Sequence, residues 1–596
     1  MTSSMCLVEI EGSPLPDDLV PLLISAYVED SQRLPDMFAL RFRDPERIVL
    51  SKSNAKVGSK IKVKVLVAQS STPVTLIEGE ITALELEFDT GGTFTVIRGY
   101  DPAHRLFRDR RTVSYVQMTA SDIAKKVAQR AGLTVGTVTS TSTVFPFVSQ
   151  AGQTDWEILS QLARDSGSDL TVRNGSFSFV SSATAASAEP SVTLKFGEEL
   201  TRFRSVVTSA QQVAEVQVRG WNVAEKSPLV GTAKAQTTSV ELATLTPAAV
   251  AGVFGSPRYV STEVPYRSQN EVDQAAKALA EEKASAFAEF EGVARGNPSL
   301  RAGTKIKIEG LGEPFEGKYT ITSSRHRFDP TTGYTTMITV TGKQDRSLLG
   351  LASGGARSRQ APSGVAIALV TDLQDPDKQG RVKLKFPWLD DDYVSGWARV
   401  VFLGAGKDRG LIVLPEVGDE VLVAFEQQDF DRPVVLGGLF NGKDTVPTGP
   451  NDLVDGGSGA VNRRSLVSRL GHRVDVLDQG GSKEGIRICT KDEKLLIHVD
   501  KTNTTITVQA DGKVLIEGSK GITIDAKSSD LTLKAQSIAM NATQGVKLDG
   551  GSGAVSVKSS GSVSVEGMNV NVKAQAAAKL EASATTTISG GLVRIN

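Results

Sequence analysis

The sequence has 596 residues, with 67 basic and 68 acidic side chains and a formal net charge of −1 at pH 7. This length predicts several domains, and the balanced charge argues against nucleic acid or an anionic membrane as the main partner. No Lys or Arg precedes Arg33, and no apolar run approaches the roughly 18 residues of a membrane helix, so the sequence predicts a protein made in the cytoplasm without a signal peptide.

Two stretches of the N-terminal half share one pattern of strands and glycines. The first, "VGSKIKVKV…LIEGEITALELEFDTGGTFTVIRGYD", begins at Val57, and the second, "AGTKIKIEG…PFEGKYTITSSRHRFDPTTGYTTMITVTGK", begins at Ala302. We therefore expect two similar β-barrels in a mainly β chain, at residues 1–101 and 201–350. Three chains with two such barrels each would form a ring of six, which suits an adaptor between a threefold and a sixfold object.

An α/β insert is expected between the barrels, at residues 102–200. Within it, "SDIAKKVAQRAGL" and "DWEILSQLARDSG" are predicted to be short amphipathic helices, opened by Thr119 and Thr154 and each stopped by a glycine. A longer helix, opened by Ser268, is predicted to run to about Phe290 within the second barrel segment. The N-terminal part of the chain is thus expected to be α+β.

A linker at residues 351–363 is expected to lead into a small β-barrel at residues 364–448. Five short strands alternate there, in "GVAIALVTDL", "GRVKLKFPWL", "WARVVFLG", "GLIVLPEVGDEVLVAF" and "RPVVLGGLF", which predicts a barrel of the OB type. The acidic residues of "PEVGDEV" are expected to shape a tight turn rather than a catalytic cluster. "DLQDPDKQG" lacks the spacing of a calcium loop and predicts a hairpin. No face combines aromatic and basic residues, which argues against nucleic-acid binding.

The C-terminal part follows a different rule, because no aromatic residue follows Phe440 and no proline follows Pro450. After a neck at residues 449–484, pairs of apolar residues two apart recur at residues 485–596, separated by Gly, Ser, Asn, Asp and Lys. The spacing places each pair on one face of a short strand, with turn formers between strands. The pairs are Ile486/Ile488, Ile497/Val499, Ile506/Val508, Val514/Ile516, Ile522/Ile524, Leu531/Leu533, Ile538/Met540, Val546/Leu548, Val555/Val557, Val563/Val565 and Val570/Val572.

A strand with two inward side chains is too short to turn around its own core. Three chains can each supply one wall of a triangular prism, with all apolar pairs pointing to the axis and few free sheet edges. We therefore expect a C-terminal trimeric β-prism (a triple-stranded β-helix). About a dozen strands at roughly 5 Å each would give a rod on the order of 60 Å long. A disordered tail is the alternative, although such tails lack regular β-branched pairs.

The sequence offers no assembled catalytic or metal chemistry. Cys6 and Cys489 lie in different kinds of segment and are predicted to be reduced thiols rather than a disulfide or a metal motif. HExxH, GxSxG, Walker and Rossmann motifs are absent from the sequence. We expect no enzyme activity, no cofactor and no metal. His104 and His326 lie beside arginines and are expected to be structural, and the remaining histidines are His472 and His498.

Several segments resemble one known family. "DPDKQGRVKLKFPWL" and "GAGKDRGLIVLPEVGDEVLVAFEQQDFDRPVVLGGLFNGKD" are similar to the OB-type base of phage-tail spikes and VgrG proteins. Upstream, "GYDPAHRLFRDRRTVSYVQMTASDIAKKVAQRAGL", "QAGQTDWEILSQLARDSG", "VQVRGWN" and "RHRFDPTTGYTT" resemble the hub of VgrG and phage late-control D proteins. The resemblance implies the hub and central spike of a contractile injection apparatus, which punctures a target envelope.

The resemblance also implies partners and a location. They are two further copies of the chain, inner-tube and baseplate proteins at the N-terminal hub, a PAAR-like tip protein at the C-terminus, and effector cargo. Assembly would take place in a bacterial cytoplasm, and contraction would carry the spike to the target cell. Some relatives bind iron at the tip through histidines, but no histidine follows His498. The residues expected to contact the tip protein are Leu592, Val593, Arg594, Ile595 and Asn596.

Two alternative functions stay open at this point. One is a spike-associated enzyme that degrades cell walls, but the gap between Asn441 and about Gly485 is too short for a hydrolase domain. The other is an adhesin with a β-rod stalk, which would need an export signal and would not explain the duplicated barrel. The sequence does not distinguish a phage tail, an extracellular particle and a type VI machine.

Overall fold

The chain forms two compact units, Met1–Pro447 and Thr448–Asn596. Both are mainly β with few helices, as the strand patterns predict. None of the helices in the described ranges is both long and apolar enough to cross a membrane. The linker predicted at residues 351–363 lies outside the described residues. The computed structural model describes residues 4–68, 70–181, 189–343, 364–481 and 483–595.

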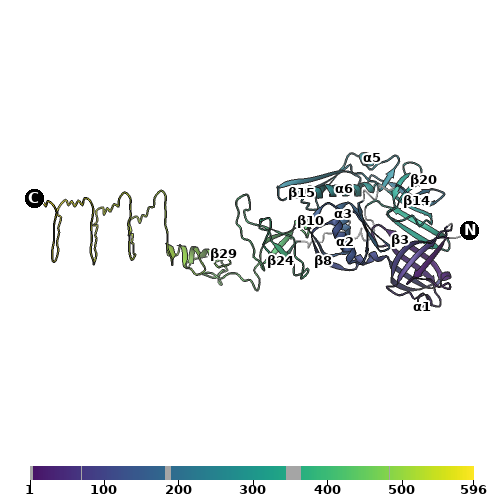
Figure 1. Ribbon diagram of the computed structural model, residues 1–596, viewed down its shortest axis with the longest axis horizontal. Coiled ribbons are helices and arrows are strands. Elements are labelled where there is room, and N and C mark those ends of the chain that lie inside the picture. The colour runs from purple at the N-terminus through teal and green to yellow at the C-terminus, as the bar shows by residue number, and fades with distance from the viewer. Residues whose placement is uncertain (1–3, 69, 182–188, 344–363, 482, 596) are drawn as a thin grey trace. The chain divides into compact units, whose positions relative to one another are not determined.

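One antiparallel sheet of eleven strands joins the two repeated stretches of the first unit (Figure 1). The junction is the pairing of β22 with β3, which sets Ser324 against Asp30 and Phe328 against Ala26. Each copy keeps a hydrophobic core of its own. The order is β14 (Leu200–Val207), β19 (Ala288–Arg295), β23 (Gly333–Val340), β22 (Ser323–Asp329), β3 (Leu23–Ser31), β4 (Met37–Arg43), β7 (Gly92–Tyr100), β6 (Val74–Asp89), β5 (Lys60–Leu66), β1 (Met5–Ile10) and β2 (Ser13–Pro14).

The two copies have the same succession of strands, but one long strand of the first copy corresponds to two shorter strands in the second. In the first copy, β6 is one strand with a bulge between Ile81 and Ala83. The corresponding stretch of the second copy is split into β21 (Gly317–Thr320) and β22, and β21 pairs with β20 (Lys305–Glu309) in a separate sheet. That four-stranded sheet has the order β13 (Val192–Lys195), β20, β21, β17 (Val240–Leu242). The closure of each copy into a barrel stays a prediction.

The three predicted helices begin at their predicted caps. In each, the hydroxyl of the cap accepts a hydrogen bond from the backbone N–H three residues on, and α3 and α6 have the complete capping box. These local signals are readable from the sequence because both partners lie within one turn. The helices are α2 (Ala120–Arg130) after Thr119, α3 (Asp155–Ser166) after Thr154, and α6 (Gln269–Ser285) after Ser268.

The predicted end of the third helix near Phe290 is wrong. α6 ends at Ser285, and residues 288–295 form β19 in the large sheet. Ala288, Phe290, Gly292 and Ala294 are buried at two-residue spacing, which is the period of a strand. Pairing with β14 and β23 on both sides decides the conformation there.

The insert packs α2 and α3 against two small sheets around one core. A further sheet and α6 form a second α/β layer with its own core, which the sequence analysis had not separated from the second barrel. The insert strands are β8 (Arg110–Thr119) with β10 (Val144–Thr154), and β9 (Thr134–Val138), β11 (Ser168–Arg173) and β12 (Ser176–Ser181). The second layer contains β15 (Glu215–Asn222), β16 (Ser227–Lys234) and β18 (Arg258–Ser261).

The last part of the first unit is a five-stranded sheet around an aromatic core that includes Phe386, Tyr393, Phe425 and Phe430. Its order is β25 (Lys383–Lys385), β24 (Val365–Asp372), β27 (Glu420–Phe425), β28 (Pro433–Gly438) and β26 (Arg399–Val400). The short helical turns of this unit are η1 (Val20–Leu22), α1 (Val49–Ser53), η2 (Pro102–Phe107), α5 (Pro247–Gly252) and η3 (Glu426–Gln428).

The second unit begins with an antiparallel sheet in which each strand pairs with the next one along the chain. Its strands are β29 (Arg463–Val467), β30 (Arg473–Gln479), β31 (Lys483–Cys489), β32 (Leu495–Asp500) and β33 (Thr505–Ala510). Residues 511–595, all of them described, contain no strand or helix in the single chain. The strands predicted there therefore stay a prediction for the assembled protein.

Candidate functional site

The sheet of the second unit has one face of exposed apolar side chains, which we call the bare face. Its residues are between 38% and 74% exposed, and they lie in two rows because the strands are in register. A contiguous apolar surface of this kind marks an association surface. One row contains Leu466, Val474, Ile488, Ile497 and Val508, and the other contains Val476, Ile486, Val499 and Ile506.

Most residues of the bare face were predicted from the sequence. The predicted pairs from Ile486/Ile488 to Ile506/Val508 lie on the bare face as expected. Leu466 and the pair Val474/Val476 were not predicted to belong to this surface, because they lie within the predicted neck at residues 449–484. The signal was present, since "VDV" in β30 has the same two-residue spacing.

The remaining pairs, from Val514 to Val572, are also exposed in the single chain. Residues 511–595 contain no strand in the single chain, so the pairing of these segments stays a prediction. The predicted tip contacts are exposed as well: Leu592 by 74% and Ile595 by 88%. Asn596 lies outside the described residues.

The opposite face of the same sheet carries a buried polar network, which we call the neck clamp. Asp475 is fully buried and accepts hydrogen bonds from Arg473 at 2.7 and 2.8 Å and from the Ser465 hydroxyl at 2.6 Å. Arg463, only 4% exposed, donates to Ser465 at 2.9 Å and to the carbonyl of Asn451 at 3.0 Å. This cluster was not predictable from sequence patterns, because its members are up to 24 residues apart.

The OB-type sheet confirms the predicted turn chemistry. Asp419 accepts the backbone N–H of Glu416 at 2.8 Å, and Gly418 between them has φ 97°, as a tight turn requires. Asp375 accepts the Arg381 guanidinium and the N–H groups of residues 377, 379 and 381. These contacts hold the pKa of Asp375 well below its usual range. The loop is a hairpin, as predicted, and an ion pair between Arg381 and Asp375 closes it.

The histidines are dispersed. His104 lies 3.0 Å from Glu80, which also pairs with Arg105. His326 is fully buried, where burial lowers its pKa to about 3, and its ring nitrogen lies 2.9 Å from the Tyr334 hydroxyl. His472 and His498 lie in the second unit, and Cys6 and Cys489 are both free thiols. Within the described ranges, no group of three His, Cys, Asp or Glu side chains could hold a metal ion.

Two buried carboxylates, Asp30 and Asp36, lie near one guanidinium where the two copies of the repeated stretch meet, and a third buried carboxylate, Asp101, belongs to a residue hydrogen-bonded to Asp36 through the backbone. Asp30 forms an ion pair with Arg301 and accepts the N–H of Ala302 at 2.8 Å, while Asp36 lies 3.8 Å from the same arginine. The N–H of Asp101 donates to the carbonyl of Asp36 at 2.9 Å. Burial raises the pKa of Asp101 to about 7 and that of Asp36 well above its ordinary value.

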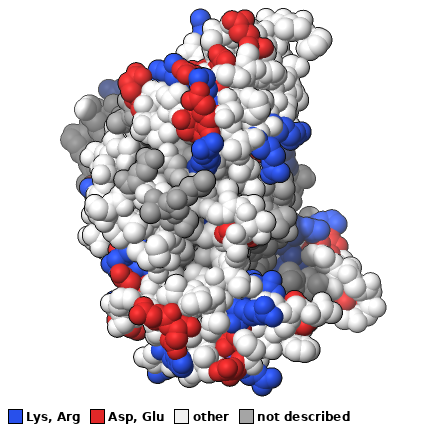
Figure 2. Space-filling view, turned by 90° about the vertical axis from the view of Figure 1, so that its right-hand side faces the viewer, with Lys and Arg blue, Asp and Glu red and all other residues white. Residues whose placement is uncertain are grey.

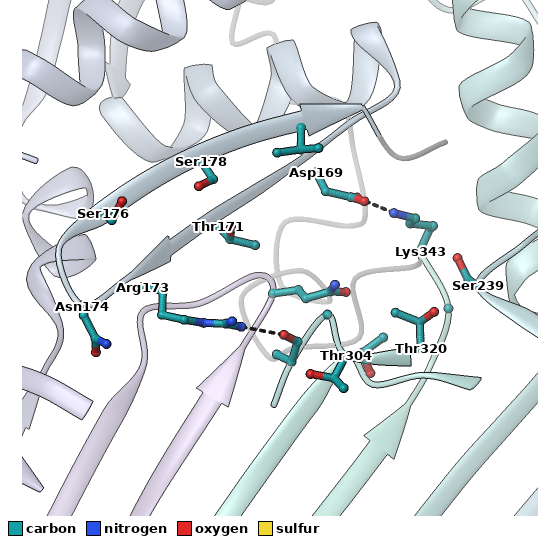
Figure 3. Close-up of a pocket in the computed structure, with 16 residues that line it drawn as sticks. Asp169, Thr171, Arg173, Asn174, Ser176, Ser178, Ser239, Thr304, Thr320 and Lys343 are labelled. Carbon is teal, nitrogen blue, oxygen red and sulfur yellow. Dashed lines mark hydrogen bonds and ion pairs between the residues drawn. The ribbon is translucent and has the colours of Figure 1, made fainter. Parts of the chain in front are cut away.

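A polar pocket of about 650 Å³ lies between the β11–β12 hairpin and the second copy (Figure 3). Asp169 forms an ion pair with Lys343 across it, and Arg173 donates to the carbonyl of Ala302 at 2.8 Å. The rest of its lining is mostly hydroxyl groups, among them Thr171 and Ser178. Its described lining contains no histidine or cysteine and offers no nucleophile–base pair.

Charges on the first unit are arranged as pairs. Cross-strand pairs on the large sheet include Lys64 with Glu9 at 2.6 Å and Lys62 with Glu78 at 2.7 Å. On the face drawn in Figure 2, basic and acidic side chains are interspersed rather than gathered by sign. That face does not offer the single-signed surface with which proteins attract nucleic acid.

Two family models match the chain. Residues 366–440 match the type VI secretion system/phage-baseplate injector OB domain, and residues 44–329 match the Alg8 N-terminal domain. The first match coincides with the five-stranded sheet around Phe386 and Phe430.

Curated relatives are spike proteins. The chain is 30% identical over 154 residues to the type VI secretion system spike protein VgrG1c of Pseudomonas aeruginosa, covering 25% of this chain and 20% of that protein. It is also 30% identical over 161 residues to the actin cross-linking toxin VgrG1 of Vibrio cholerae, covering 25% of this chain and 14% of that protein. The matched stretch thus spans about a fifth of the length of VgrG1c and less of the toxin.

The solved structure of a Francisella PdpA–VgrG complex has the same fold. It aligns with 85% of this chain and 88% of its own, at 8% identity and a TM-score of 0.50. The chain thus combines an injector OB domain at residues 366–440 with the fold of that complex. Over about a quarter of its length the chain is similar to VgrG proteins. One of these two relatives is named a spike protein and the other an actin cross-linking toxin.

Proposed function

We propose that this chain is the hub and central spike of a contractile injection apparatus. In this proposal a trimeric needle punctures the target envelope, and the hub joins the needle to a sixfold inner tube and to baseplate proteins. The observation that carries the proposal is the bare face together with the exposed apolar pairs of residues 511–595. This surface must be covered for the protein to remain in solution.

Further copies of the same chain are the partners that best fit the exposed apolar rows and would cover them. The strands β30 to β33 already form a flat wall with its apolar rows on one side. Three such walls, turned inward, would enclose one narrow apolar axis, which has room for Val and Ile but not for aromatic rings. The tail supports the same arrangement, because its Val and Ile pairs continue at the same spacing. A β-prism over residues 485–596 is therefore part of the proposal.

The first unit supplies the other half of the adaptor. Its two copies of one strand succession would give six similar elements in a trimer, which matches the symmetry of a sixfold tube. We propose residues 1–101 and 201–350 as the two hub barrels, residues 102–200 as the insert, and residues 364–448 as the OB-fold base of the spike. Effector cargo at the tip or base belongs to the same proposal.

A truncation after Pro447 tests the trimer. We expect the full chain to show a mass of three times 63.2 kDa by light scattering, and the truncated protein to lose or weaken this association. The physical reason is that the truncation removes the bare face and the tail together. A monomeric full chain would rule out both the shared prism and the adaptor from three to six.

Deletion of residues 592–596 tests the tip. We propose that Leu592, Val593, Arg594, Ile595 and Asn596 contact a PAAR-like tip protein, because the apolar side chains among them are exposed at the end of the needle segment. The deletion is expected to leave the trimer intact and to abolish co-purification of a co-expressed tip protein. Unchanged co-purification would exclude these residues as the contact.

A further inference from the structure

Within one chain, the two copies of the repeated stretch are joined by the pairing of β22 with β3. In this junction Phe328 of the second copy lies opposite Ala26 and packs into the hydrophobic core of the first copy, where it is only 9% exposed. A closed ring of six copies requires an equivalent junction between neighbouring chains. The first copy must then offer a counterpart of β22, and the second copy a counterpart of β3.

The counterpart of β22 is the second half of β6. Both strands form the first arm of a tight hairpin and end on an aspartate, Asp89 in β6 and Asp329 in β22. Counting back one residue puts Phe88 in the place of Phe328. Residues 82–89 pair with β7 on one side, and no described strand pairs with them on the other, because β5 pairs only with the first half of β6. This free edge corresponds to the edge of β22 that pairs with β3.

The counterpart of β3 is β14. β3 pairs with β4, and β14 pairs with β19, and each pairing has a bulge at the same place, between Leu23 and Ser25 in β3 and between Leu200 and Arg202 in β14. Phe203, which follows the bulge in β14, thus takes the place of the alanine that faces the buried phenylalanine of β22. β14 is the last strand of the large sheet, so its outer edge is also free.

We propose that the second half of β6 in one copy of the chain pairs with β14 of the next copy, as an antiparallel continuation of the large sheet. The register of the β22–β3 junction, transferred to these strands, sets Phe88 opposite Phe203 and Glu87 opposite Arg204 of the next copy. The inference rests on the proposed trimer and assigns the surface through which its hub closes. A free sheet edge is a ready template for such pairing.

The apolar side chains of the two edges fit this junction. Phe88 is 84% exposed and Leu86 is 60% exposed in the single chain, whereas Phe328 is covered by the first copy. Phe203 packs against the core of the second copy, and its ring is stacked on Phe290 with a centroid distance of 6.4 Å. Phe88 would therefore cover the second core of the next chain as Phe328 covers the first core of its own chain.

The charges of the two edges are opposite in sign. The second half of β6 carries Glu85, Glu87 and Asp89, whereas β14 carries Arg202 and Arg204. Both arginines are exposed, and neither forms an ion pair with another residue that the structure describes. Opposite charges on facing strands favour pairing, and like charges oppose it. A second copy of the chain is thus the partner whose edge complements the free edge of β6.

Disulfide trapping between two differently tagged full-length chains tests the register. One chain carries Glu87→Cys and the other carries Arg204→Cys. Opposed residues of an antiparallel pair have Cα atoms about 4.5–5.5 Å apart, which is within the span of a disulfide. We expect a disulfide between residues 87 and 204 of different chains, identified by mass spectrometry of the linked peptides.

The matched control replaces Arg204→Cys by Arg202→Cys. Arg202 is also an exposed arginine of β14, but it lies diagonally from Glu87 in the proposed register, where Cα atoms are roughly 7–8 Å apart. We expect at least fivefold less disulfide from this pair. Equal yields from the two pairs, or trimers without the 87–204 product, would overturn the proposal. A native chain that is monomeric by light scattering would instead overturn the proposed trimer, so the two failures are distinguishable.

Hydrogen exchange tests the same pairing without a substitution in either strand. The native trimer is compared with single chains of the Val508→Asp variant, whose substitution lies in the second unit. Backbone amides on the free edges of residues 82–89 and 202–207 are expected to exchange at least tenfold more slowly in the trimer. Amides of β19, which is paired on both sides within the chain, are expected to exchange equally in both proteins. Equal exchange at the two free edges would contradict the proposal.

Discussion

Val508→Asp is expected to convert the assembled protein into single chains. Val508 lies in a row of the bare face, opposite Ile497 on the neighbouring strand. In the proposed prism three such carboxylates would meet at the axis, and each unpaired buried charge costs several kcal/mol in addition to about 1.5–3 kcal/mol of lost apolar burial. Light scattering should show a mass near 63.2 kDa for the variant at concentrations where the native chain is trimeric.

The adjacent residue provides the control. Gln509 is on the same strand but on the opposite face, because successive side chains alternate. Gln509→Asp adds the same charge and is expected to keep the native mass. If both variants dissociate, net charge rather than the bare face would explain the effect. If neither does, the bare face is not the association surface.

Asp101→Asn is expected to stabilise the first unit at pH 8 and to flatten its dependence on pH. Burial raises the pKa of Asp101 from an ordinary 3.8 to about 7. Below pH 4 the carboxyl is protonated in both the folded and the unfolded chain. Between pH 4 and 7 only the unfolded chain loses this proton, so the free energy of unfolding falls by about 4 kcal/mol as the pH rises, and it is constant above that range.

Tryptophan fluorescence during urea unfolding measures this effect selectively, because all four tryptophans lie in the first unit. The native chain should be less stable at pH 8 than at pH 5, and Asp36, whose pKa is also raised, adds to the same trend. The exposed Asp109 supplies the control, since Asp109→Asn is expected to leave the pH dependence unchanged. An Asp101→Asn protein with the native slope would show that this carboxyl is ionised in the folded chain at pH 5.

Features held within one turn or one strand were predictable from the sequence. The caps at Thr119, Thr154 and Ser268 are formed by residues three apart, so each capping motif specifies its helix locally. The apolar pairs of β31 to β33 follow a two-residue period and lie on one face as expected. The duplicated strand pattern and the turn at Gly418 were visible for the same reason.

Features that join distant segments were not predictable. The pairing of β22 with β3 connects residues about 300 apart, and the sequence of neither strand identifies the other as its partner. The end of α6 is similar, since pairing with β14 and β23 makes the segment after Ser285 a strand, whereas the helix was expected to run to about Phe290.

The sequence by itself determined that this protein ends in repeated apolar pairs on short strands, and hence that it carries a surface which a single chain does not bury. Only the tertiary structure decided that the face behind these pairs holds a buried carboxylate, Asp475, enclosed by Arg473 and Ser465. The physical reason is that an apolar period is a property of neighbouring residues. The burial and pairing of a charge depend instead on every segment that packs around it.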